Sequence, residues 1–265
     1  MASRARYGLR AVAVGYVGVL VVAPLVVVFW RTFRDGGAAF WSAVSSPDAV
    51  HAFELTAVVA GLAVAANTVF GIGVALLLAR YHFPGRRALS ILVDLPISVS
   101  PIVIGLALVL VYGPVDGWFG PTLSSAGVQV IYAMPGMVLA TILVSLPLVV
   151  RELVPVLEEE GLDQDSAARS LGANARQRFV RITLPTIKWA LAYGMVLSMA
   201  RSIGEFGAVR VVSGDVIGKT QTSTLLVADR AEQFEPGSYQ VALVLITFAA
   251  VCIVAISLLR PKEGG

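Results

Sequence analysis

SAARSLGANARQRFVRITLP (residues 166–185) is a basic segment that lies between two long apolar stretches, residues 130–150 and 187–209. Charged side chains are costly inside a bilayer, so a segment with four arginines is expected to lie outside the hydrocarbon core. The apolar stretches on either side are long enough to cross a membrane as helices. The segment therefore predicts a folded loop that connects two membrane-spanning helices.

The pattern within this loop is helical with one interruption. Asp163, Asp165 and Ser166 suit the start of a helix, where polar side chains interact with free amide groups. Gly172 interrupts the helix, and Pro185 opens the next one, at a position that needs no amide hydrogen. We predict two short helices joined near Gly172. The apolar residues at helical spacing are Ala168, Leu171, Ala175, Phe179 and Ile182.

The composition of the whole chain is that of an integral membrane protein. The 265 residues are 57% hydrophobic and 14% charged, and the mean hydropathy is +0.82. Soluble domains carry roughly 25% charged residues, so this chain has too few charges to cover a water-facing surface. The net charge of +3 is explained by membrane topology and does not indicate nucleic-acid binding.

Membrane-length apolar segments recur along the chain. A spanning helix needs about 20 mostly apolar residues, and this criterion predicts about six transmembrane helices. We therefore expect an all-α, polytopic membrane protein that retains its first hydrophobic segment as a span. The predicted spans are residues 11–30, 55–79, 88–112, 130–150, 187–209 and 237–259.

Basic residues are distributed unevenly between the two sides of the predicted membrane domain. Most of them fall in the N-terminal tail, around residues 80–87, in residues 151–188 and at the C-terminus. Because cytoplasmic loops carry an excess of lysine and arginine, both termini and the loop at residues 166–185 are predicted to be cytoplasmic. The chain is therefore predicted to be a multi-pass protein of the cell (plasma or inner) membrane.

Two ionisable residues, Arg201 and Glu205, lie within a predicted span. They are four residues apart on one predicted helix, so they can neutralise each other. Alternatively, they border the path of an anion, because guanidinium donors suit tetrahedral oxyanions. We also expect Asp94 to be interfacial, near Arg86 or Arg87. The candidate translocation-path residues are Ser98, Ser100, Pro101, Arg201, Ser202 and Glu205.

No catalytic or metal-binding constellation is visible in the sequence. SGDVIGKT (213–220) resembles a phosphate-binding loop, but its glycines are wrongly spaced and we expect an external turn. His51 and His82 are expected in opposite loops, and Cys252 is expected to be a small buried residue. We therefore expect no enzyme activity, no metal and no cofactor in this chain.

The basic loop resembles a family motif. The spacing A-A-x3-G-x9-I-x-L-P matches the cytoplasmic EAA loop of ABC importer permeases, with Ser166 in place of the usual glutamate and Asp165 beside it. In that family the loop is the coupling helix that docks on the ATPase subunit. The residues to which the resemblance assigns this role are Asp165, Ser166, Ala167, Ala168, Leu171, Gly172, Ile182, Leu184 and Pro185.

Further segments resemble one branch of this family. DLPISVSPIVIGLALVLVYG (94–113), MPGMVLATILVSLPLVVRELVPVLEE (134–159) and ARSIGEFGAVRVVSG (200–214) are similar to sulfate/thiosulfate permeases, and most similar to the W-type subunits. The resemblance implies a type I ABC importer permease fold. It also implies half of a translocation path for sulfate, with thiosulfate as a further candidate substrate.

The resemblance implies partners as well. These are a T-type permease subunit that completes a heterodimer, two copies of a cytoplasmic ATP-binding subunit that uses ATP and Mg, and an extracytoplasmic sulfate- or thiosulfate-binding protein. It divides the chain into residues 1–50, a transmembrane domain at 51–259 with the coupling loop at about 152–186, and a cytoplasmic tail at 260–265. A molybdate or tungstate permease is the alternative function; a secondary transporter and an intramembrane enzyme are less favoured.

Overall fold

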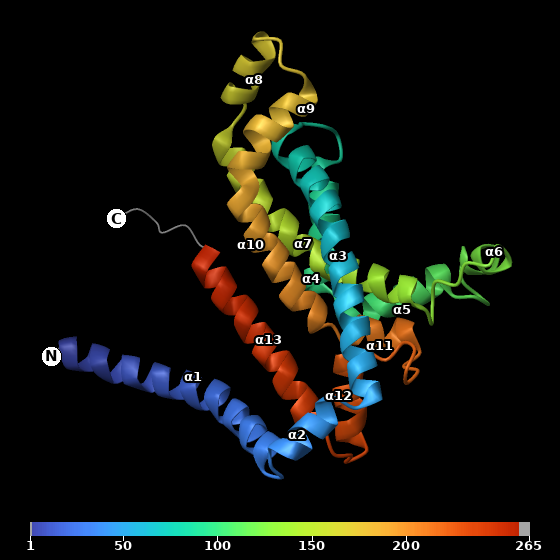
Figure 1. Ribbon diagram of the computed structural model, residues 1–265. Helices are drawn as coiled ribbons and strands as arrows, with labels where there is room; N and C mark the ends of the chain where they lie inside the picture. The colour runs from blue at the N-terminus through green and yellow to red at the C-terminus, as the bar shows by residue number, and fades with distance from the viewer. Residues whose placement is uncertain (1, 260–265) are drawn as a thin grey trace.

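The computed structural model describes residues 2–259, and this part of the chain is helical and contains no strand (Figure 1). The prediction of an all-α fold is confirmed, whereas the predicted tail at 260–265 lies outside the described residues. The helices are α1 (Ala2–Phe33), α2 (Gly37–Val44), α3 (Pro47–Arg80), α4 (Arg86–Ser98), α5 (Pro101–Tyr112), α6 (Gly120–Ser125), α7 (Met134–Glu160), α8 (Asp163–Ser170), α9 (Ala175–Arg178), the π-helix η1 (Phe179–Thr183), α10 (Leu184–Ile203), α11 (Gly207–Ser213), α12 (Ser223–Glu232) and α13 (Ser238–Leu259).

Helices of membrane length make up most of the described chain. Helix α3, for example, has 34 residues and is about 51 Å long at 1.5 Å per residue, more than the ~30 Å of a hydrocarbon core. Helix α1 diverges from the rest of the bundle in Figure 1, and its apolar side chains are exposed, as lipid contact permits. The helices long and apolar enough to span are Val12–Phe33, Pro47–Arg80, Met134–Glu160, Ala175–Ile203 and Ser238–Leu258, and α4 with α5 is a bent pair of the kind seen in a broken span or a re-entrant loop.

One end of the bundle, which we call the basic end, is formed by residues 80–87 and 158–183. Arg80 Nη2 lies 3.2 Å from Glu160 Oε2, so the last residues of α3 and α7 are adjacent. Helices α3 and α7 therefore both run toward the basic end. Helices α8 and α9 belong to this end and form the top of the molecule in Figure 1.

The other end of the bundle, the opposite end, is formed by residues 32–46 and 204–238, whereas α6 projects from the side of the bundle in Figure 1. Thr56 near the start of α3 lies 3.0 Å from Ser223 at the start of α12, between their hydroxyl oxygens. The start of α7 lies at this end too, so the α4–α5 segment carries the chain away from the basic end. This arrangement agrees with the alternating topology predicted from the sequence.

The predicted span at residues 88–112 is not one straight helix, because the chain bends by 116° between α4 and α5. Ser100 precedes Pro101 and has φ −59° and ψ 134°. A residue before proline is forced out of the α conformation by contact with the proline ring, so the helix ends there. Pro101 then begins α5, which packs against α11.

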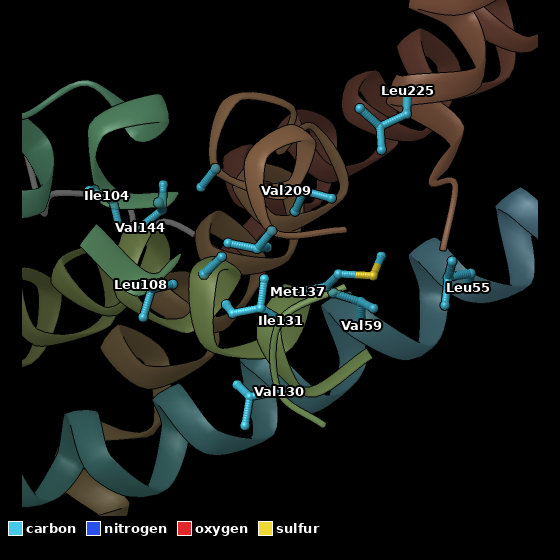
Figure 2. Packing of buried hydrophobic residues seen from close by; sticks show 13 residues of the cluster. Leu55, Val59, Ile104, Leu108, Val130, Ile131, Met137, Val144, Val209 and Leu225 are labelled. Atoms are coloured by element: carbon cyan, nitrogen blue, oxygen red, sulfur yellow. The ribbon is translucent and has the colours of Figure 1, made fainter. Parts of the chain in front are cut away.

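Buried apolar residues form two main clusters along the bundle. The first lies toward the opposite end and includes Leu55 and Val59 of α3, Met137 of α7 and Val209 of α11 (Figure 2). In this cluster the absence of a side chain at Gly105 is required, because a Cβ there would lie 2.8 Å from the Ala208 carbonyl oxygen. The second lies toward the basic end and comprises Ala75, Leu78, Val93, Val149, Val150, Leu153, Leu157, Ile187 and Leu191.

Candidate coupling and translocation sites

Residues 161–183 form a helical loop at the basic end. Helix α8 covers Asp163–Ser170, and α9 covers Ala175–Arg178 before the chain continues through η1 into α10. Gly172, between the two helices, has φ +86°, a conformation that L side chains rarely adopt. The prediction of two short helices joined near Gly172 is confirmed, and Pro185 lies in the first turn of α10 as predicted.

The turn between α8 and α9 presents an exposed leucine beside small residues. Leu171 is 88% exposed, and a Cβ placed on Gly172 would meet nothing within 4 Å. The helical spacing of apolar residues from 168 to 182 does not correspond to one continuous face, because the left-handed turn at Gly172 redirects the chain. Ala167 and Gly172 are both exposed, so another protein can approach the backbone closely here.

The other predicted coupling residues divide between the loop surface and the bundle. Ser166, at the family's glutamate position, is exposed, and so is Pro185. Ala168 and Ile182 are partly buried, and Leu184 packs against the apolar cluster at the basic end. The motif thus combines an exposed surface on α8 with partly buried residues that pack on the bundle where η1 joins α10.

Asp165 points away from that exposed surface and into a group of charged side chains. Its carboxylate pairs with Arg178 of α9 and lies 3.7 Å from Nη1 of Arg80 at the end of α3. Arg80 also pairs with Glu160, whose other oxygen accepts a 2.9 Å hydrogen bond from the hydroxyl of Thr186. We call these residues, Asp165, Arg80, Arg178 and Glu160, the Asp165 cluster. Together with Thr186 of α10, the cluster joins five helical elements at the basic end.

Arg201 and Glu205 form the predicted ion pair, with 2.7 Å between Nη2 and Oε2. They do not lie on one helix as predicted, because α10 ends at Ile203. Glu205 Oε1 accepts a 2.8 Å hydrogen bond from the Ala208 amide, and so caps the start of α11. The Glu205 side chain is 2% exposed and that of Arg201 is 35% exposed, so only the cation is accessible.

The two helix breaks, between α4 and α5 and between α10 and α11, meet inside the bundle. A Cβ on Gly207 would lie 3.0 Å from Pro101 Cβ, so these backbones are in close contact. Ser98 and Ser100 are exposed at the first break, whereas Ser202 is buried near the second. The structure therefore brings the two predicted path segments together, with Ser202 directed into the protein rather than toward solvent.

Asp94 lines one pocket with Arg86, as predicted, but it pairs with neither Arg86 nor Arg87. Asp94 Oδ1 accepts a 2.8 Å hydrogen bond from Arg151 Nε on α7, and Arg86 pairs instead with Glu158. Asp94 lies eight positions after Arg86 on α4, about 12 Å away along the axis. The packing of α4 on α7 supplies a nearer arginine.

A buried polar cluster at the contact of α3, α7 and α10 was missed by the sequence analysis. The Asn67 amide nitrogen donates hydrogen bonds to the hydroxyls of Ser145 and Ser198, at 2.8 and 3.4 Å. The Ser202 hydroxyl donates in turn to Ser145 at 3.3 Å. An asparagine within an apolar span was the available signal, because buried polar groups need partners there.

The stretch that resembles a phosphate-binding loop is a turn at the opposite end, following α11. Arg210 of α11 lies 3.3 Å from Asp215 and 2.9 Å from Asp229. Burial raises the pKa of Asp215 above its ordinary value, and the Asp229 carboxyl adds to the effect, whereas Gln221 and Arg210 act in the other direction. Asp215 lies within the turn and Asp229 of α12 shares Arg210 with it, so the turn is unsuited to a phosphate group.

The residues that the structure describes include no group of histidine, cysteine, aspartate or glutamate that suits a metal ion. His51 lies within α3, not in a loop as predicted, and His82 follows the other end of that helix. Cys252 is buried, as predicted.

Ionisable side chains placed at helix breaks within an apolar bundle, together with a folded loop whose surface is open to another protein, define a multi-pass transport protein of the membrane. The match to a family model specifies it further. Residues 67–262 match the model described as binding-protein-dependent transport system inner membrane component, and the chain belongs to this family.

Curated relatives and solved structures resemble nearly the whole chain. It is 45% identical to the sulfate transport system permease protein CysW of Synechococcus elongatus, over 94% of this chain and 87% of that protein. It is 34% identical to the sulfate transport system permease protein CysT of Salmonella typhimurium, over 94% and 90%. A bacterial alginate ABC transporter, solved in complex with alginate pentasaccharide-bound periplasmic protein, matches with TM-score 0.75 and 19% identity over 96% and 91% of the two chains. That structure supports the fold.

Proposed function

We propose that this chain is a permease subunit of an ATP-driven importer and forms half of a translocation path for sulfate. The observation that carries the proposal is the likeness, over nearly the whole chain, to permease proteins of sulfate transport systems. The meeting of two helix breaks beside Arg201 gives the bundle a place where a charged group is accessible within the membrane domain. Charged residues at such depth are costly and are typical of transport pathways.

The partners follow from the same relationships. Two kinds of sulfate permease protein resemble this chain, at 45% and 34% identity, which supports a pair of different permease subunits. We propose a T-type partner, a periplasmic or extracytoplasmic sulfate-binding protein, and two copies of a cytoplasmic ATP-binding subunit. ATP and Mg would be used by that subunit, and this chain would hold no cofactor.

The exposed turn at Gly172 is the proposed contact for the ATP-binding subunit. Its Leu171 side chain is largely exposed, and small neighbours allow close approach. The excess of basic residues at this end favours a cytoplasmic location, with both termini on the same side. Closure of the ATPase dimer would then move α8 and α9 and, through them, the spans.

ATP-dependent sulfate uptake by the assembled complex is the first predicted result. Proteoliposomes that contain both permeases and the ATP-binding subunit, supplied with the binding protein, should accumulate labelled sulfate only when ATP and Mg are present on the ATPase side. Molybdate in excess should not compete, if sulfate is the substrate. Competition by molybdate at low concentration would instead support a molybdate permease, and uptake without the ATPase would support a secondary transporter.

Replacement of Arg201 tests the proposed path. One hydrogen bond to a charged group is worth about 1.5–3 kcal/mol, so loss of such a contact to the anion should slow uptake roughly 10- to 100-fold in Arg201→Ala. Arg201→Lys keeps the charge without the planar fork of donors and should lose less. Initial uptake rates, normalised to assembled complex, measure the effect. Unchanged rate and selectivity in Arg201→Ala would assign Arg201 a structural role only.

A further inference from the structure

Asp165, which lies beside the position where the family usually has a glutamate, is not exposed as a residue that contacts a partner protein would be. Ser166 occupies the glutamate position and is exposed, whereas the Asp165 side chain is 18% exposed and faces Arg80 and Arg178. All four charged side chains of the Asp165 cluster are at most 22% exposed. Partly buried charges of this kind depend on their partners, because water does not replace a lost partner there.

The Asp165 cluster connects the coupling helix to the spans without using the loop backbone. Asp165 lies in the first turn of α8, Arg178 ends α9, and Arg80 and Glu160 are the last residues of α3 and α7. Further along the bundle, Asn67 of α3 bonds to Ser145 of α7 and to Ser198 of α10. The same three helices are thus joined by polar contacts at two depths, with the apolar cluster at the basic end between them.

We propose that Asp165 is a positioning residue that fixes α8, the coupling helix, to the ends of α3 and α7 at the basic end. Displacement of α8 by the ATPase would then move these two spans together. The proposal rests on the proposed function and assigns Asp165 an internal role within it. Asp165 does not replace the missing glutamate as a contact to the ATPase. Helices α3, α7, α8, α9 and α10 accordingly move as one unit, and the breaks at residues 99–100 and 204–206 are where α5 and α11 change orientation relative to it.

Asp165→Asn separates this role from docking. The side chain keeps its size but loses the charge, so Arg178 loses its ion-pair partner while Arg80 keeps Glu160. We expect the ATP-binding subunit to co-purify normally and ATP hydrolysis to continue, while sulfate uptake per ATP hydrolysed falls about tenfold, as for an uncoupled transporter. Asp165→Glu restores the charge and should recover part of the loss. Asp163→Asn, an exposed acid on the same turn of α8, is the matched control and should behave as wild type.

A second measurement reports on α8 independently of transport. Arg169 and Arg176 are exposed trypsin sites in the loop. Release of α8 and α9 from the Asp165 cluster should raise the rate of cleavage at these sites by about tenfold in Asp165→Asn and not in Asp163→Asn, because cleavage follows the open population. The trypsin comparison is made on the full chain in membranes that lack the ATP-binding subunit, so that no docked partner covers the two sites, and the purified complex is used for the uptake measurement.

The outcomes distinguish the two proposals. Loss of the ATP-binding subunit from Asp165→Asn, with unchanged trypsin cleavage, would assign Asp165 to docking and overturn the inference. Wild-type uptake per ATP in Asp165→Asn would also overturn it. A wild-type complex that takes up no sulfate would contradict the proposed function, and the trypsin comparison would still decide whether Asp165 holds α8.

Discussion

Gly172→Glu is expected to abolish sulfate uptake while the protein still accumulates in the membrane. The exposed turn at Gly172 lies between α8 and α9, where a new side chain would project into open space and meet nothing within 4 Å of its Cβ. The fold of this chain therefore accommodates the glutamate. A docked partner would not, because an unpaired charge buried at an interface costs about 3–5 kcal/mol, enough to weaken binding by more than 100-fold.

The backbone conformation at this position requires a strain control. Gly172 has φ +86°, so any L residue there pays about 1–2 kcal/mol for the left-handed conformation. Gly172→Ala introduces the strain alone and should reduce uptake only in part. Gly85→Glu places the same side chain on another exposed glycine in the left-handed conformation, with φ +98° and ψ −5° and nothing within 4 Å of its Cβ, outside the coupling loop, and should retain most uptake. Uptake rate and co-purification of the ATP-binding subunit are measured together. Normal uptake in Gly172→Glu would contradict the coupling assignment.

The coupling loop shows how much of the fold the sequence predicts. Carboxylates before an amphipathic run, a glycine within it and a proline after it are local signals, and the structure places α8, Gly172 and Pro185 accordingly. The long spans were predictable for the same reason, since about 20 apolar residues are sufficient evidence for each. Hydropathy does not show, however, where the chain changes direction within an apolar run. The 116° bend at residues 99–100 lies within a continuous apolar run, and only Pro101 signalled it.

Contacts between side chains on different helices could not be predicted from local sequence patterns. Asp94 pairs with Arg151, which is 57 residues away in the sequence, because α4 packs on α7. Asn67 bonds to Ser145 and Ser198 through the packing of three helices. The Arg201–Glu205 pair was predicted because its partners are four residues apart, although it bridges the end of a helix rather than a helical turn. Long-range partners of polar residues therefore required the structure.

The Arg201–Glu205 pair leads to the prediction with the largest effect on folding. Glu205 has two separate roles at the break between α10 and α11: one carboxylate oxygen caps the Ala208 amide, and the other pairs with Arg201. Its carbonyl also accepts a 2.7 Å hydrogen bond from the Thr224 hydroxyl of α12. Glu205→Ala removes the cap and the charge together. We expect a loss of about 2–3 kcal/mol in stability, because the Ala208 amide loses its acceptor and the partly exposed Arg201 loses its charged partner.

The two roles are separable with a second substitution. Glu205→Gln retains an oxygen that accepts from the Ala208 amide and removes only the charge, while the partly exposed Arg201 side chain can gain solvent. Its loss should therefore be smaller, since screening reduces the value of exposed charges. Thermal unfolding of the purified complex is the measurement. We expect the melting temperature to fall by about 10 °C in Glu205→Ala, by less in Glu205→Gln, and not in the exposed-site control Glu159→Ala. Equal melting temperatures for Glu205→Ala and wild type would show that neither contact stabilises the break, and Arg201 would then have to be held in the bundle by contacts other than Glu205.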